Sequence, residues 1–340
     1  MPGHDIIVIG ASAGGVEALQ TLVGGLPPAL PAAVFIVLHR PPEGPSLLAH
    51  ILARAGALPA ADGVDGEAIS PGRIYVAPPD HHLLVERGYV RVARGPKENR
   101  FRPAVDALFR SAANTYGPRV IGVILTGALD DGTAGLWAVK DRGGLAVVQE
   151  PRDALHASMP ESALRYVRVD ACVPLAKIAP TLVGFAGEPA AAEGDYPVSK
   201  KLAIETRMAR ERYSLDTGLL DVGELSPYTC PECHGSLVQL QDGSITRFRC
   251  HTGHAYSMDS LLAEVSGSLE TSLWNTLRTL QESVLLLRHL AHHARDREDG
   301  TLAERAEQRA RGAEQSALLL RDLLARQETL STDELRHQGG

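Results

Sequence analysis

The sequence lacks several features that would assign it to a large class of proteins. Its net charge is −7 at pH 7, so it has no surplus of Lys and Arg to neutralise nucleic-acid phosphates. No uninterrupted apolar run approaches the ~20 residues that span a bilayer. The first residues, MPGHDIIVIG, lack the basic start and cleavage site of a secretory signal. We therefore expect a cytoplasmic protein that binds no nucleic acid and does not insert into a membrane.

Cysteine is also scarce, with four among 340 residues. Cys172 stands alone in an apolar stretch, where we expect it to be buried in the core. The other three are Cys230, Cys233 and Cys250. Their clustering favours a metal site over a disulfide framework.

The first half of the chain has an alternating pattern. A chain of 340 residues, 44% of them apolar, is long enough for two or three domains. From residue 6 to about 185, apolar runs alternate with amphipathic helical stretches, which predicts a doubly wound α/β fold with a mainly parallel sheet. The stretch LLVERGYVRVAR interrupts this pattern and predicts an antiparallel hairpin. The apolar runs are IIVIG, AVFIVLH, RIYVAPP, VIGVILTG, LAVVQE and ACVPL.

The composition changes after this α/β region. The stretch GFAGEPAAAEGDYP is rich in Ala, Gly and Pro and predicts a linker. Near the C-terminus, Leu and Ala recur every three or four residues on both sides of a break at 298–300, which predicts a helical hairpin. We favour packing of this hairpin within one chain; the alternative is a homodimer surface. The predicted parts are an α/β domain at 1–187, a linker with a short helix at 188–225, a Cys/His module at 226–260 and the hairpin at 261–335.

Residues 6–20, IIVIGASAGGVEALQ, predict a strand, a glycine turn and a helix. The spacing of the glycines does not fit the dinucleotide-binding pattern G-x-G-x-x-G, and the second strand ends in LHR rather than in an acidic residue. The run GASAG at 10–14 instead fits G-x-S-x-G, in which a strained turn presents Ser12 as a nucleophile. The alternative is an ordinary glycine-rich turn.

A nucleophilic serine needs a base, and the base needs an orienting acid. His39 ends the second predicted strand, and Asp130 and Asp131 follow the strand at 120–125. Each alone would be an ordinary loop residue. Because the C-terminal ends of parallel strands meet at one sheet edge, we expect these groups to converge near Ser12.

Four segments of the α/β region together resemble the catalytic domain of the protein-glutamate methylesterases of bacterial chemotaxis. They are IGASAGG, LHRP, ILTGALDDGTAGL and VVQEPRDALHASMPESAL. The resemblance implies that Ser12 is the nucleophile, His39 the general base and Asp131 its orienting carboxylate, since the family's aspartate directly precedes the glycine of a T-G-x-x-x-D-G run. It places Ala13 and Ala128 near the oxyanion hole and the loop of Met159 over the site.

The same resemblance implies a function. The expected activity is hydrolysis of glutamate methyl esters, and deamidation of glutamine, on methylated chemoreceptor-like or other signalling proteins, with no cofactor for catalysis. The chemotaxis enzymes carry an N-terminal receiver domain, whereas the resemblance here begins near residue 5, so we expect regulation to lie in the C-terminal half. The alternative is a signalling adaptor that keeps the esterase fold for binding. A complete Ser, His and Asp set favours the enzyme.

The Cys/His module has the ligand spacing of a metal site. The C-x-x-C pair Cys230 and Cys233 and the C-x-x-x-H pair Cys250 and His254 predict a structural zinc site. His251 is the less favoured fourth ligand, because it directly follows a ligand. Between the pairs, SLVQLQDGSITRFRC predicts a strand hairpin. A closed four-ligand site has no place for water, so we expect zinc to stabilise the module and its removal to leave the esterase unaffected.

Overall fold

The structure is a computed structural model that describes residues 3–43, 46–210 and 218–326. The chain divides into two compact units, Met1–Leu261 and Leu262–Gly340. The finer division into four parts stays a prediction. In the described ranges, no helix combines the length and the apolar character needed to cross a membrane.

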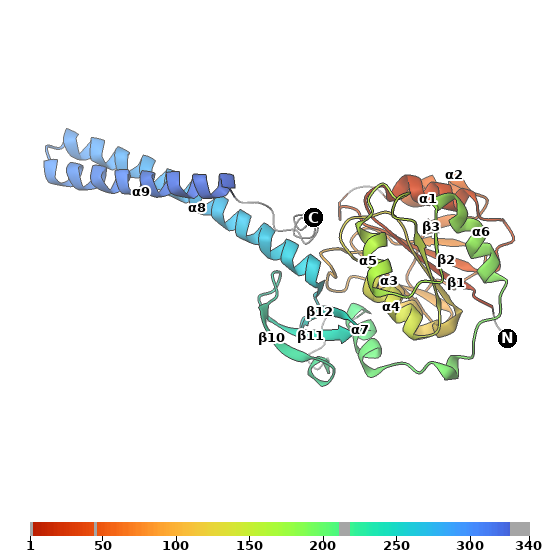
Figure 1. The fold of residues 1–340 in the computed structure, drawn as a ribbon. Coiled ribbons are helices and arrows are strands. Elements are labelled where there is room, and N and C mark those ends of the chain that lie inside the picture. Colours follow the sequence, from red (N-terminus) through yellow and green to blue (C-terminus); the bar gives the residue numbers. More distant parts are fainter. Residues whose placement is uncertain (1–2, 44–45, 211–217, 327–340) are drawn as a thin grey trace. The chain divides into compact units, whose positions relative to one another are not determined.

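A seven-stranded parallel sheet forms the centre of the first unit (Figure 1). Its strand order is β3-β4-β2-β1-β7-β8-β9, which confirms the predicted doubly wound α/β class. The sequence pattern did not predict β3, because its three residues, AAD, contain no apolar run. The strands are β1 (Ile6–Ala11), β2 (Ala33–Leu38), β3 (Ala60–Asp62), β4 (Ile74–Val76), β7 (Val120–Ile124), β8 (Leu145–Gln149) and β9 (Ala171–Val173).

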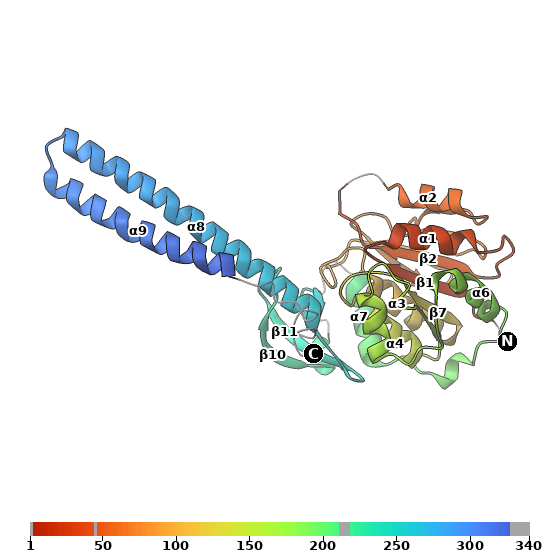
Figure 2. The same cartoon turned by 45° about the horizontal axis from the view of Figure 1, so that its top comes forward.

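Helices cover both faces of this sheet (Figure 2). Because successive strand side chains point to opposite faces, Ile7 and Ile9 of β1 pack with one helix group, while Ile6 and Val8 pack with the other. The first group is α1 (Gly15–Gly24), α2 (Leu48–Ala55) and α6 (Leu175–Ala186); the second is α3 (Val105–Tyr116), α4 (Thr133–Asp141) and α5 (Ser158–Tyr166). Both faces of the central strands are therefore buried.

The antiparallel hairpin predicted from LLVERGYVRVAR is present, as a separate two-stranded sheet of β5 (His82–Glu86) and β6 (Tyr89–Ala93).

The predicted burial of Cys172 is wrong, since this side chain is exposed. It lies on β9, which ends the sheet and pairs with β8 alone. An apolar run on an edge strand does not guarantee burial of each of its residues.

The short helix predicted within the 188–225 linker is α7 (Lys200–Arg210), and it is packed on two sides. On one side, Leu202 joins the core under α3. On the other, Ile204 and Met208 pack with Val238 and Leu240 of the Cys/His module. The helix thus lies between the α/β domain and the module. Short 3-10 turns lie at Gly117–Arg119, Glu193–Asp195 and Leu219–Asp221.

The Cys/His module is a four-stranded antiparallel sheet in the order β10-β11-β12-β13. The predicted hairpin is formed by β11 (Ser236–Asp242) and β12 (Ile245–Cys250), and Gly243 in its turn has a φ of 58°. The flanking strands β10 (Glu224–Thr229) and β13 (Ala255–Ser257) were not predicted. They are short or largely exposed, so no apolar run marks them.

The second unit contains most of α8 (Met258–Asp296) and all of α9 (Gly300–Arg326), which confirms the predicted helical hairpin and its break. Ion pairs join the two helices, Arg288 to Glu314 at 2.7 Å and Arg295 to Glu307 at 3.1 Å. Buried alanines on α9 let the helices approach closely; they are Ala303, Ala306, Ala310 and Ala317. Residues 327–335 of the predicted hairpin lie outside the described part of the chain.

The first glycine of the GASAG run is required by packing. A methyl group added to Gly10 would lie 2.2 Å from Cγ1 of Val105 on α3. We expect Gly10→Ala to lower the thermal midpoint by about 2–12 °C, because overpacking costs ~1–3 kcal/mol. In a Val105→Ala background the same change should cost less. Calorimetry checks this, with Gly184→Ala on α6 as the control, since a methyl group there meets open space. Equal costs in both backgrounds would contradict the packing argument.

Candidate active site

Ser12 follows the last residue of β1 and precedes helix α1. Its backbone N–H donates to Thr126 O at 3.0 Å, which ties it to the loop after β7. The left-handed position in this turn is Gly14, with a φ of 72°. Among the described residues, Ser12 is not one of those with a positive φ, so Gly14 rather than the serine takes the left-handed conformation in this turn.

His39 follows β2 and faces Ser12 across the sheet edge. Its Nδ1 lies 3.2 Å from Ser12 Oγ, and its Nε2 donates to Asp131 Oδ2 at 2.7 Å. Because a carboxylate only accepts, the ring proton lies on Nε2 and Nδ1 is free to accept from the serine. The two ring nitrogens thus exchange the roles they have in the serine-protease triad. The imidazole stacks on Phe101, with ring centroids 3.7 Å apart, which fixes its plane.

The carboxylate of Asp131 is buried and receives four hydrogen bonds. Oδ2 accepts from His39 and from the backbone of Val105 at 2.7 Å. Oδ1 accepts from Asn99 Nδ2 at 2.8 Å and from the backbone of Asp106 at 3.2 Å. The two backbone donors are the first residues of α3, whose positive N-terminal dipole favours a negative charge.

These donors determine the charge state of Asp131. Burial alone would raise its pKa, but the hydrogen bonds from His39, Asn99 and Val105 hold the pKa below its ordinary value. Burial and the neighbouring Asp131 raise the pKa of Asp106 to about 6. Two aspartates were candidates from the sequence. The structure places Asp131 against His39, whereas Asp130 accepts a hydrogen bond from Ser257 Oγ at 2.7 Å.

Of the two residues assigned to the oxyanion hole, Ala13 directly follows Ser12 and Ala128 directly follows Gly127. Among the described residues, the backbone N–H groups of Ala13 and Ala128 have no hydrogen-bond acceptor. Met159 is different: its side chain is fully buried, and its N–H donates to Gly127 O at 3.0 Å. A methyl group on Gly127 would lie 2.0 Å from Met159 Sδ and 2.8 Å from Ser12 Cβ. Met159 thus packs against Gly127, the residue before Ala128.

A pocket of about 520 Å³ opens beside Ser12 and His39. Cationic side chains dominate its polar lining; they are Arg40, Lys97, Arg100 and Arg102. Asp80 supplies a carboxylate and accepts from Arg102 at 2.8 Å. The balance of charge favours an anionic ligand segment.

Sequence reasoning did not identify Asn99 or Phe101. Both lie in the loop KENRFRP, which carries no periodicity and matches none of the motifs considered above. Asn99 and Arg100 have φ values of 48° and 75°, a conformation that non-glycine residues rarely adopt. Nothing in the linear pattern shows that this loop returns to the triad aspartate.

The four residues predicted to bind zinc lie together. The Sγ atoms of Cys230, Cys233 and Cys250 and a ring nitrogen of His254 are all within 4.8 Å of one another. Cys233 Sγ and Cys250 Sγ are 3.6 Å apart, and His254 Nδ1 is 3.6 Å from the thiols of Cys230 and Cys250. A tetrahedral zinc site requires edges of about 3.6–3.8 Å, so the donor set fits the ion.

The surroundings of His254 also fit a ligand role. Its other ring nitrogen, Nε2, lies 3.4 Å from Glu232 Oε2, a partner that leaves Nδ1 free to bind a metal. His251 lies outside the cluster. The arrangement therefore favours His254 as the fourth donor.

Fold and site together define a class: an α/β protein that carries a hydrogen-bonded Ser, His and Asp group at the C-terminal edge of a parallel sheet. Residues 7–182 match the family model described as CheB methylesterase, and the chain belongs to this family.

Named relatives agree with this assignment. The chain is 38% identical over 187 residues to "Protein-glutamate methylesterase/protein-glutamine glutaminase 4" of Anaeromyxobacter dehalogenans, covering 54% of this chain and 52% of that protein. A relative from Leptospira interrogans is 40% identical over 177 residues, which are 52% of this chain and 92% of that protein. The CheB methylesterase catalytic domain of Thermotoga maritima matches with a TM-score of 0.52 and 35% identity, covering 54% of this chain and 99% of that structure. The chain thus spans about half the length of the Anaeromyxobacter protein.

Proposed function

We propose that this protein is a serine esterase that hydrolyses glutamate γ-methyl esters on signalling proteins through an acyl-enzyme. The observation that carries the proposal is a pair of contacts made by His39, one to Ser12 Oγ and the other to the buried carboxylate of Asp131. The names of the similar proteins support the substrate class.

In the first step, Ser12 Oγ attacks the ester carbonyl while His39 Nδ1 accepts its proton. The imidazolium is stabilised by Asp131, which stays ionised because its pKa is held low. The N–H groups of Ala13 and Ala128 donate to the oxyanion of the tetrahedral intermediate. His39 then returns the proton to the leaving oxygen, the C–O bond breaks and methanol departs.

In the second step, water attacks the acyl-enzyme and gives a proton to His39. Collapse of the intermediate releases the glutamate carboxylate and regenerates the Ser12 hydroxyl group. With glutamine as substrate, the same steps release ammonia in place of methanol. Neither reaction needs a cofactor.

The cationic pocket supports an acidic peptide segment as the substrate. Arg40 and Lys97 lie on its lining beside the reactive hydroxyl, where they attract carboxylates next to the esterified glutamate. A methylated chemoreceptor-like or other signalling protein fits this requirement. A homodimer formed through the C-terminal helices stays a prediction.

Ser12→Ala should reduce methanol release from a helical peptide bearing glutamate γ-methyl esters by about 10³-fold or more. It should also abolish covalent labelling by a fluorophosphonate, which reacts with activated serines. The fold should persist, because the Ser12 side chain contributes only its contact with His39.

The matched control is Ser70→Ala, an exposed serine of the same domain, which should behave as wild type. Full labelling and hydrolysis in Ser12→Ala would remove the nucleophile assignment. Absence of both in the wild-type protein would favour the alternative function, a signalling adaptor that retains the fold for binding.

We also propose that the Cys230, Cys233, Cys250 and His254 cluster holds a structural zinc ion. Purified protein should contain about one zinc per chain by elemental analysis, and cobalt substitution should give the absorption of a tetrahedral thiolate site. Cys230→Ser and His254→Ala should each lower the metal content. Cys172→Ser and His251→Ala are the matched controls and should retain it. Retention of the metal in His254→Ala and its loss in His251→Ala would reverse the assignment of the fourth ligand.

A further inference from the structure

The Cys/His module contacts the loop that approaches the triad. Strand β13 pairs with residues of this loop through backbone hydrogen bonds, from Asn99 N–H to Ala255 O at 2.8 Å and from Ala255 N–H to Lys97 O at 3.3 Å. Ala255 directly follows His254 of the metal-type cluster. These backbone hydrogen bonds join the module to the loop.

Both polar atoms of the Asn99 side-chain amide form hydrogen bonds, Nδ2 with the α/β domain and Oδ1 with the module. Its Nδ2 donates to Asp131 Oδ1 at 2.8 Å and to Asp106 Oδ2 at 2.9 Å. Its Oδ1 accepts from the backbone N–H of Ser257 at 2.9 Å and from Ser260 Oγ at 3.1 Å. One end of the amide therefore holds the carboxylates of the α/β domain, and the other end is held by the module.

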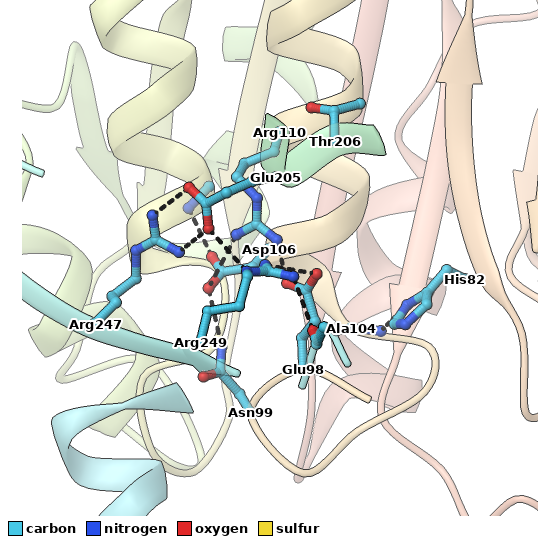
Figure 3. Close-up of polar contacts among 12 residues, drawn as sticks. His82, Glu98, Asn99, Ala104, Asp106, Arg110, Glu205, Thr206, Arg247 and Arg249 are labelled. Carbon is cyan, nitrogen blue, oxygen red and sulfur yellow. Dashed lines mark hydrogen bonds and ion pairs between the residues drawn. The ribbon is translucent and has the colours of Figure 1, made fainter. Parts of the chain in front are cut away.

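Buried ion pairs join the module to the loop and to the α/β domain (Figure 3). Glu98, the neighbour of Asn99, pairs with Arg110 of α3 and, at 2.9 Å, with Arg249 of β12. All three side chains are almost completely buried. Because removal of one member leaves an uncompensated buried charge, these groups require one another.

Helix α7 extends the same network. Glu205 accepts from both Nη atoms of Arg247 at 2.7 Å and from Arg249 Nε at 3.2 Å (Figure 3). Arg247 Nε also donates to Asp242 at 2.7 Å. Positive and negative groups alternate from the module to α3. Undocking the module would expose or unpair each of them, so the loop carrying Asn99 has one strongly favoured position.

We propose that Asn99 is a positioning residue for the triad, held in place by the Cys/His module through Ser257 and Ser260. This inference rests on the proposed esterase function. Asn99 does not contact the reacting atoms; it orients the Asp131 carboxylate so that Oδ2 faces His39 Nε2. The module is accordingly part of the esterase, and its docking sets the turnover rate.

The expected effect follows from the bond that is lost. A hydrogen bond to a charged group is worth about a 10- to 100-fold change in rate when it is needed in the transition state. Asn99→Gly is the variant of choice, because glycine tolerates the left-handed backbone of this position while removing the amide. It should lower kcat on the γ-methyl-ester peptide about 10- to 100-fold and leave KM unchanged.

A second variant removes the contact from the side of the module. Ser260→Ala deletes one donor to Asn99 Oδ1 and should lower kcat by about 2- to 10-fold, also at constant KM. Ser226→Ala is the matched control, a module serine whose hydroxyl donates to Leu237 O instead. It should keep the wild-type kcat.

Rates are normalised to the folded fraction, which is measured by calorimetry. Wild-type kcat in folded Asn99→Gly would overturn the inference. A loss of activity that only follows the loss of folded protein would also overturn it, since Asn99 would then be merely structural. Ser12→Ala in the same assays distinguishes a failure of the proposed function from a failure of the Asn99 inference. If it stays active, the proposed function fails and this inference fails with it; if it is inactive, the variants test Asn99 alone.

Discussion

The buried carboxylate of Asp131 is the group on which the site depends. An ionised carboxylate in the protein interior is costly unless donors surround it. Here the donors come from a histidine after β2, from the N-terminus of α3 and from Asn99. Since these elements are far apart in the sequence, satisfying one charge requires the sheet, a helix and the loop to assemble together. The same assembly aligns His39 with Ser12.

The support of Asp131 also makes the triad of the α/β domain depend on the Cys/His module. The sequence pattern suggested a zinc module that would leave the esterase unaffected on losing its metal. The contacts do not support that independence, because Asn99 and Glu98 are shared between the module and the α/β domain. Helix α7, predicted as part of a linker, packs with both. A metal ion that orders β12 and β13 would therefore order the triad's support as well.

Much of this architecture is readable from local pattern. Apolar runs predicted the parallel strands except β3, and the spacing C-x-x-C with C-x-x-x-H predicted the cysteine cluster. Resemblance of motifs selected Asp131 over Asp130. Asn99 and Phe101 were not predictable, because their roles arise from a loop that folds back through tertiary contacts. Cys172 was wrongly predicted to be buried, because an apolar run does not reveal whether its strand lies at the sheet edge.

A crystal structure of the fluorophosphonate-treated protein tests the central claim most directly. It should show a covalent bond from Ser12 Oγ to phosphorus, with the phosphoryl oxygen facing the N–H groups of Ala13 and Ala128. Asp131 should still accept from both His39 and Asn99. Modification of a different residue, or an Asp131 carboxylate turned away from His39, would contradict the account.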